Sequence, residues 1–206
     1  MRFTFLGHSA IAVSAPEGTI IVDPGALTDL SCLQDADAVL LTHAHGDHVA
    51  VDAVAATSLP VWGAVEALDA LATAGHTGAR TELNPGDTAT ILGQEVRVIG
   101  GLHEVIHPEV PRPENLAFYM DGLLHPGDEY AESPWPVDVL LLPVAGPWVK
   151  AEHAANYARR VAPHNTVPVH DAVLSPAGKQ LIDGLLGTKL ALPGYRRLAV
   201  GETLEF

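Results

Sequence analysis

The sequence has only one cysteine, few aromatic residues and little positive charge. Cys32 is the single cysteine among 206 residues, so no disulfide bond can form within the chain, and we interpret its thiol as a bystander. The chain has 11 Lys and Arg residues and 25 acidic residues, which gives a formal net charge of −14 at pH 7. This excess of acid disfavours nucleic acid and anionic membranes, since both are bound through basic patches.

Long hydrophobic runs are also missing. No stretch is long enough to cross a membrane. The first residues alternate like a strand and lack the apolar core of a secretory signal. We therefore expect a cytoplasmic protein with no membrane partner and no nucleic-acid partner.

Apolar sequence is nevertheless sufficient for a folded domain. Hydrophobic residues make up 48% of the chain, while charged residues make up 17% and aromatic residues 5%. This is the composition of a globular protein rich in Ala, Val and Leu, not of a disordered one. Because no repeat or linker is evident, we expect residues 1–206 to form a single domain.

Strand and helix patterns alternate along the chain. Short apolar or alternating runs predict strands at residues 2–6, 10–14, 19–22, 60–62, 80–83, 88–92, 94–99, 116–120, 123–125, 137–142 and 166–169. Helices are predicted at 48–56, 64–74, 150–161 and near 176–186, with further strands within 189–206. This order predicts an α/β fold in which two mixed sheets pack face to face with helices outside.

Potential metal ligands are concentrated directly after the apolar run Val39–Leu41, which has the pattern of a buried strand end. The next residues are Thr42-His43-Ala44-His45-Gly46-Asp47-His48. The first two histidines can point the same way, because alternate residues of an extended chain share a side. The aspartate and the last histidine follow the bend at Gly46 and can face a second point. Imidazole and carboxylate are ligands of borderline divalent metals, so this segment indicates metal binding.

Two further histidines stand at predicted strand ends. His103 follows the strand 94–99 and His170 follows the strand 166–169, so both can reach the edge that carries the metal loop. With His103 the site has three histidines and open coordination positions, which is typical of a catalytic metal. His107 is the alternative candidate for the metal-ligand role of His103. It lies in the proline-rich loop 107–113, either a semi-rigid lip over the site or a plain surface connection.

Other polar and aromatic residues have two interpretations each. Asp23 ends a strand and either accepts a hydrogen bond from a ligating imidazole or starts a turn. His8 is either a turn residue or a pocket residue. Trp148 either borders the pocket or packs beneath a helix. The three histidines without other ligands nearby are predicted to lie on the surface: His76, His153 and His164.

The segment from Thr42 to His48 resembles the His-x-His-x-Asp-His signature of the metallo-β-lactamase-fold hydrolase superfamily. The superfamily's other motifs have counterparts, in order, in Gly7-His8-Ser9, Val22-Asp23-Pro24, His125-Pro126-Gly127-Asp128 and Val167-Pro168-Val169-His170. Nearly the whole chain is covered, and it is most similar to the small, single-domain, lactonase-like branch. The resemblance implies a four-layer αββα sandwich of two mixed β-sheets, with every ligand at one edge.

The resemblance also implies two divalent metal ions. Zinc is the expected metal, and manganese and iron accept the same ligands. Asp128 resembles the carboxylate that bridges both ions, although Glu129 follows it where a small hydroxyl residue is usual. Asp47 and Asp128 are the expected catalytic carboxylates, and His170 is the partner of Asp47 and His48. The implied metal ligands are His43, His45, Asp47, His48, His103, Asp128 and His170.

The expected reaction is hydrolysis of a small ester, lactone, thioester or phosphoester by a hydroxide that bridges the two ions. The ligands, ions and hydroxide sum to a charge of about +1, which favours a small anionic or carbonyl substrate. An iron-dependent oxidoreductase on the same scaffold and a non-catalytic metal-binding protein are the alternatives. Some such oxidoreductases replace the second histidine of the loop with an acid, whereas His45 is retained here.

Overall fold

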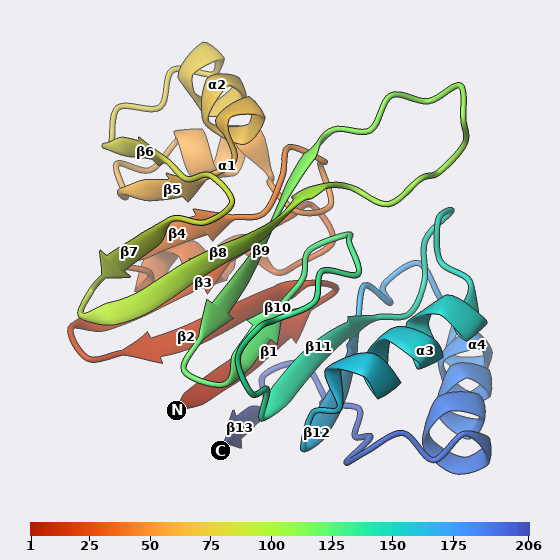
Figure 1. Cartoon of the computed structure of the whole chain (residues 1–206). Coiled ribbons are helices and arrows are strands. Elements are labelled where there is room, and N and C mark those ends of the chain that lie inside the picture. The colour runs from red at the N-terminus through yellow and green to blue at the C-terminus, as the bar shows by residue number, and fades with distance from the viewer.

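The computed structural model describes residues 1–206 as two β-sheets with helices on their outer faces (Figure 1). The first sheet has the order β13 (Thr203–Glu205), β1 (Arg2–Gly7), β2 (Ala10–Ala15), β3 (Gly18–Val22), β4 (Ala38–Leu41), β5 (Val61–Gly63) and β6 (Arg80–Glu82). The second has the order β12 (Asn165–Val169), β11 (Val139–Pro143), β10 (Leu123–His125), β9 (Glu114–Met120), β8 (Gln94–Leu102) and β7 (Thr88–Ile91). The helices are α1 (Val51–Ala55), α2 (Val65–Thr73), α3 (Ala151–Val161) and α4 (Pro176–Asp183), with a 3-10 helix at Leu30–Asp35 and a π-helix at Gly184–Lys189. None of them is long and apolar enough to span a membrane.

Strand periodicity accounts for the layers. In β4, Ala38 and Leu40 face the core between the sheets, while Val39 and Leu41 belong to the core beneath α1 and α2. Alternate residues of β11 divide in the same way between the central core and the core beneath α3. Three apolar cores thus separate four layers, which confirms the predicted αββα sandwich of two mixed sheets.

Strand direction gathers the functional loops at one edge. In the first sheet β1, β3 and β4 run the same way, since β1 and β3 are antiparallel to β2, and β3 is parallel to β4. In the second sheet β8 and β10 are both antiparallel to β9, while β10, β11 and β12 are mutually parallel. The segments that follow these strands carry every predicted ligand.

The C-terminal region differs most from the sequence prediction. Strands were expected within 189–206, but only β13 forms there. The segment before β13 contains Pro193 and Gly194, and it is joined to β12 by hydrogen bonds from Thr166 N to Gly194 O and from Arg196 N to Thr166 O. The helix expected near 176–186 is α4, extended by the π-helix. The helix expected from residue 48 begins at Val51.

Candidate metal centre

Two groups of potential ligands lie at the edge where these strands end. The first group is His43, His45, His103 and Asp128, and the second is His8, Asp47, His48 and His170. Within each group, one ligand atom from every residue lies within 4.8 Å of the others. The structure therefore brings together all seven residues that the sequence indicates as ligands, and adds His8.

Close backbone packing shapes the loop after β4. The amides of His48 and Val49 both donate to the carbonyl of His45, which closes a tight turn, and Ala26 N donates to Gly46 O. Gly25 lies directly against this turn, and a Cβ added there would be 1.8 Å from the carbonyl oxygen of Asp47. Only glycine allows the loop after β3 to support the ligand loop this closely.

Asp128 lies between the two groups. Its Oδ2 is 3.3 Å from His103 Nε2 on one side and 3.1 Å from His170 Nε2 on the other. Its Oδ1 is 3.1 Å from His48 Nε2. The carboxylate therefore faces members of both groups at once, as the position of a bridging ligand requires.

Asn115 on β9 holds Asp128 in this position. Its Oδ1 accepts a hydrogen bond from Asp128 N at 2.9 Å, and its Nδ2 donates to Pro126 O and to Glu129 Oε2. Glu129 also accepts from Gly101 N, so this carboxylate joins the Asp128 turn to the end of β8 rather than facing the ligand groups. Burial raises the pKa of Glu129. No sequence pattern marks Asn115, which occupies an ordinary position in β9.

Asp23 accepts three hydrogen bonds beneath the ligand loop. His48 Nδ1 donates to Asp23 Oδ2 at 2.7 Å, Thr42 Oγ1 donates to the same oxygen at 2.6 Å, and Thr42 N donates to Oδ1 at 2.8 Å. The side chain of Asp23 is fully buried. Of its two interpretations, the structure thus places Asp23 as the acceptor for an imidazole.

Hydrogen bonds at Nδ1 leave the Nε2 atoms of three histidines free. His48 Nδ1 donates to Asp23, and His103 Nδ1 donates to Glu104 O at 2.6 Å. Thr42 Oγ1 gives its proton to Asp23, so its oxygen accepts from His43 Nδ1 at 3.0 Å. A neutral imidazole protonated at Nδ1 has its lone pair at Nε2, the atom that could bind a metal.

The buried atoms without hydrogen bonds test whether these residues fit a metal. They include His43 Nε2, His48 Nε2, Asp128 Oδ1 and both ring nitrogens of His170. Buried polar atoms are normally paired, because leaving them unpaired is costly. The unpaired Nε2 atoms of these three histidines and the Asp128 oxygen belong to the two ligand groups, and they are imidazole nitrogen and carboxylate oxygen. This donor set fits divalent metal ions such as zinc, manganese and iron.

The carboxylates make this edge attractive to positive charge. Although burial opposes the charged form of His170, the carboxylates of Asp128 and Asp47, 3.1 and 3.3 Å from its Nε2, raise its pKa to about 9. Burial likewise opposes the charge on His48, but the nearby carboxylates of Asp128 and Asp23 raise its pKa well above the usual value. Without other cations the centre therefore holds protons that a metal ion has to displace.

Substituting Asp23 with asparagine should weaken metal binding while preserving the loop. Asparagine is isosteric and tolerates the positive φ of 50° found at this residue. Its amide cannot accept all three hydrogen bonds, so the ring of His48 loses its fixed orientation. We expect metal affinity to fall by about 10- to 100-fold, measured by competition with a chromophoric chelator. Unchanged affinity would show that Asp23 does not orient His48.

Of the remaining residues predicted for the site, one lies beside the metal centre and one lies on the surface. Trp148 borders the centre, with its ring centroid 5.7 Å from that of His103 and 6.0 Å from that of His170. His107 is exposed and belongs to neither ligand group, and the loop that carries it projects away from the sheets (Figure 1).

The prediction that His76 lies on the surface was wrong. Its side chain is buried beside Arg80, whose guanidinium donates to the His76 carbonyl at 2.6 Å. Gly78, in the segment before β6, lies against both the Leu59 carbonyl and the His76 ring, and the sequence has no periodic pattern that would show this. His153 and His164 are exposed, as predicted.

Sequence comparison relates most of the chain to known proteins. The family described as "Beta-lactamase superfamily domain" matches residues 2–170. Protein Rv0786c of Mycobacterium tuberculosis is 34% identical over 214 residues, covering 100% of both chains. A UPF0173 metal-dependent hydrolase of Ruegeria is 28% identical, covering 94% of this chain and 96% of the relative.

Solved structures share the same architecture. Igni18, described as a metallo hydrolase from Ignicoccus hospitalis, superposes with a TM-score of 0.73 at 23% identity, covering 100% of this chain and 98% of its own. CmlA, a diiron β-hydroxylase from Streptomyces venezuelae, gives a TM-score of 0.69 at 14% identity, covering 100% of this chain and 54% of its own. At these identities the likeness shows the fold alone.

Proposed function

The chain belongs to the β-lactamase superfamily as a metal-dependent hydrolase, and on this premise we propose that it hydrolyses a small ester, lactone, thioester or phosphoester with two divalent metal ions. The position of Asp128 carries the proposal, because one carboxylate contacts the histidines of both groups. A single-metal site would need only one of the two groups. We propose zinc as the native metal.

Each group would hold one ion, and Asp128 would serve both. The three histidines of the first group leave coordination positions open, as a catalytic site requires. When bound, two such ions lower the pKa of a water molecule to about 7 and polarise the electrophilic carbon or phosphorus. The reaction then needs no serine or cysteine nucleophile, and Cys32 belongs to neither ligand group.

The protein's own residues position the reactants and exclude water. Asp23 and Thr42 fix the ring orientations of His48 and His43. Trp148 forms an apolar wall beside His103 and His170. The Asp47 side chain is 31% exposed, against 4% or less for the three histidines of its group, so it is the member of that group most open to a substrate.

A metal-replacement assay tests the proposal. The protein is stripped of metal and reloaded with zinc, manganese or iron. Metal content and turnover are then measured on chromogenic esters, lactones, thioesters and phosphoesters. We expect about two ions per chain and metal-dependent hydrolysis of at least one class. Replacing the exposed His153 with alanine should change neither quantity and serves as the control. Full loading with no turnover of any class would contradict the proposal.

The same preparations separate hydrolysis from oxidation. The likeness to a diiron β-hydroxylase concerns the fold alone. An iron-dependent oxidoreductase would consume oxygen when loaded with iron and given a reductant, whereas a hydrolase would not. We expect no oxygen consumption above that of the metal-free protein.

A further inference from the structure

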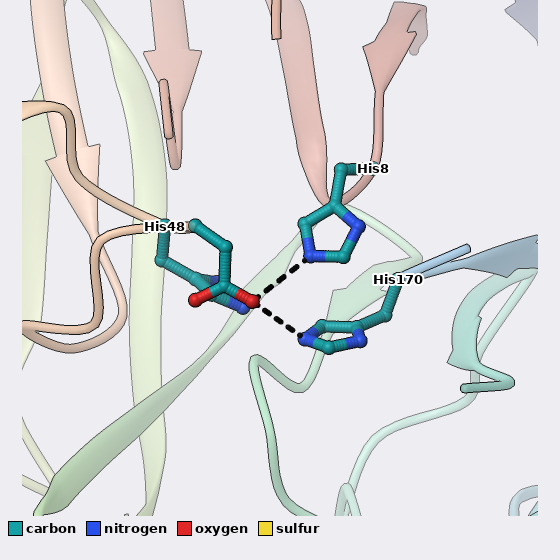
Figure 2. A group of neighbouring side chains, drawn as sticks. His8, His48 and His170 are labelled. Carbon is teal, nitrogen blue, oxygen red and sulfur yellow. Dashed lines mark hydrogen bonds and ion pairs between the residues drawn. The ribbon is translucent and has the colours of Figure 1, made fainter. Parts of the chain in front are cut away.

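His8 contacts three residues of the second ligand group although it lies far from them in sequence. It follows β1 in the hairpin to β2, and its side chain is fully buried. The His8 carbonyl accepts a hydrogen bond from His170 N at 2.8 Å. Its ring centroid is 4.1 Å from that of His170 and 5.9 Å from that of His48. Figure 2 shows the rings of His8 and His170 on the same side of a carboxylate, with dashed lines from both rings to one shared oxygen.

Two hydrogen bonds fix the tautomer of this imidazole. Ala172 N donates to His8 Nδ1 at 3.3 Å, so Nδ1 carries a lone pair rather than a proton. The single proton of a neutral imidazole is then on Nε2. That atom lies 3.1 Å from Asp47 Oδ2, and it therefore donates to the carboxylate.

This tautomer is incompatible with metal ligation by His8. If Nε2 bound an ion while Nδ1 kept its bond from Ala172 N, the ring would have to lose both protons. The other histidines show the opposite arrangement, since the Nδ1 atoms of His43, His48 and His103 donate and their Nε2 atoms are free. His8 therefore carries its proton on the opposite ring nitrogen from these three proposed ligands.

We propose that His8 is a positioning residue that anchors Asp47 Oδ2 and so presents Oδ1 of the same carboxylate to the second metal ion. The inference rests on the proposed two-metal centre but not on hydrolysis. Orienting groups of this kind typically change metal affinity by about 10- to 100-fold. The effect should be confined to the second site, because His8 contacts no residue of the first group.

The positive φ of 51° at His8 makes the choice of variant important. Asparagine adopts this conformation readily but is too short to reach Asp47, so His8→Asn removes the hydrogen bond with little backbone strain. Glutamine is long enough to place an amide N–H near the former Nε2 position, so His8→Gln should restore part of the effect. His153→Ala is the control for an exposed histidine.

Zinc affinities of the two sites, measured by chelator competition, test the proposal. We expect His8→Asn to weaken the second site by about 10- to 100-fold, leave the first unchanged, and leave the unfolding temperature of the metal-free protein close to that of His153→Ala. His8→Gln should recover part of the lost affinity. Equal weakening of both sites with a lower unfolding temperature would make His8 a structural residue and overturn the proposal.

Cobalt substitution distinguishes positioning from ligation. If His8 orients Asp47, X-ray absorption of the cobalt-loaded His8→Gln variant should show the same number of nitrogen ligands as the parent protein. One nitrogen fewer would make His8 a ligand and overturn the proposal, as would unchanged affinity in His8→Asn. Because no substrate is used, a protein that binds both ions but hydrolyses nothing would contradict the proposed function without altering these expectations.

Discussion

Replacing Asp128 with alanine is expected to abolish hydrolysis and to reduce metal binding from about two ions per chain to one or fewer. Asp128 is the only carboxylate within contact distance of histidines from both groups, and both of its oxygens take part. Its loss leaves four buried imidazoles without a shared negative partner. We expect kcat/KM to fall by about a thousandfold or more, since metal positioning and charge stabilisation fail together. Metal quantification and a rate assay on the same preparation measure both effects.

The Asp128→Asn variant removes the negative charge of this residue and keeps its shape, so it tests the effect of the charge alone. The amide keeps the size of the carboxylate and has one oxygen, so it can contact one ion but cannot offer an anionic oxygen to each. We therefore expect near-normal folding, one tightly held ion and little activity. If Asp128→Ala kept both ions at the parent affinity, the two groups would be independent sites and the proposed dinuclear centre would be wrong.

The positions of the ligands could be predicted because they follow from strand ends. His43, His103 and His170 each come directly after an apolar or alternating strand pattern, and parallel strands of a layered fold end at a common edge. The prediction that the ligands lie close together therefore required no knowledge of side-chain packing. The same logic located Asp23 at the end of β3, although its role stayed open between turn and acceptor.

The supporting residues could not be predicted, because their partners are set by tertiary packing. Asn115 occupies a position like any other in its strand. Its role in holding Asp128 depends on the turn after β10, which packs against it in the folded protein. The tautomer of His8 depends on Ala172, which is 164 residues away. His76 was expected on the surface, yet the chain before β6 covers it. Hydrogen-bond partners far apart in sequence leave no periodic signal.

Metal removal should destabilise the protein strongly. The metal-free protein keeps several imidazole nitrogens and a carboxylate oxygen buried without hydrogen bonds, and metal ions would satisfy them. An ion that binds the folded chain alone stabilises it by about 4 kcal/mol at a free concentration about 1,000-fold above its Kd. We expect the unfolding temperature to fall on treatment with a chelator and to recover on addition of zinc. An unfolding temperature that does not respond to saturating zinc would contradict a folded-state metal site.

Proton release provides a second, independent measurement of metal binding. The carboxylates hold the pKa of His170 at about 9 and that of His48 well above its usual value, so they favour the protonated form of both rings until a metal ion binds. Ligation requires neutral imidazole, and metal binding must displace these protons. Affinity should therefore weaken as the pH falls, and calorimetry in buffers of different ionisation enthalpy should detect proton release. In Asp128→Ala the same rings lose the carboxylate that raises their pKa values, so fewer protons should be released for each ion bound.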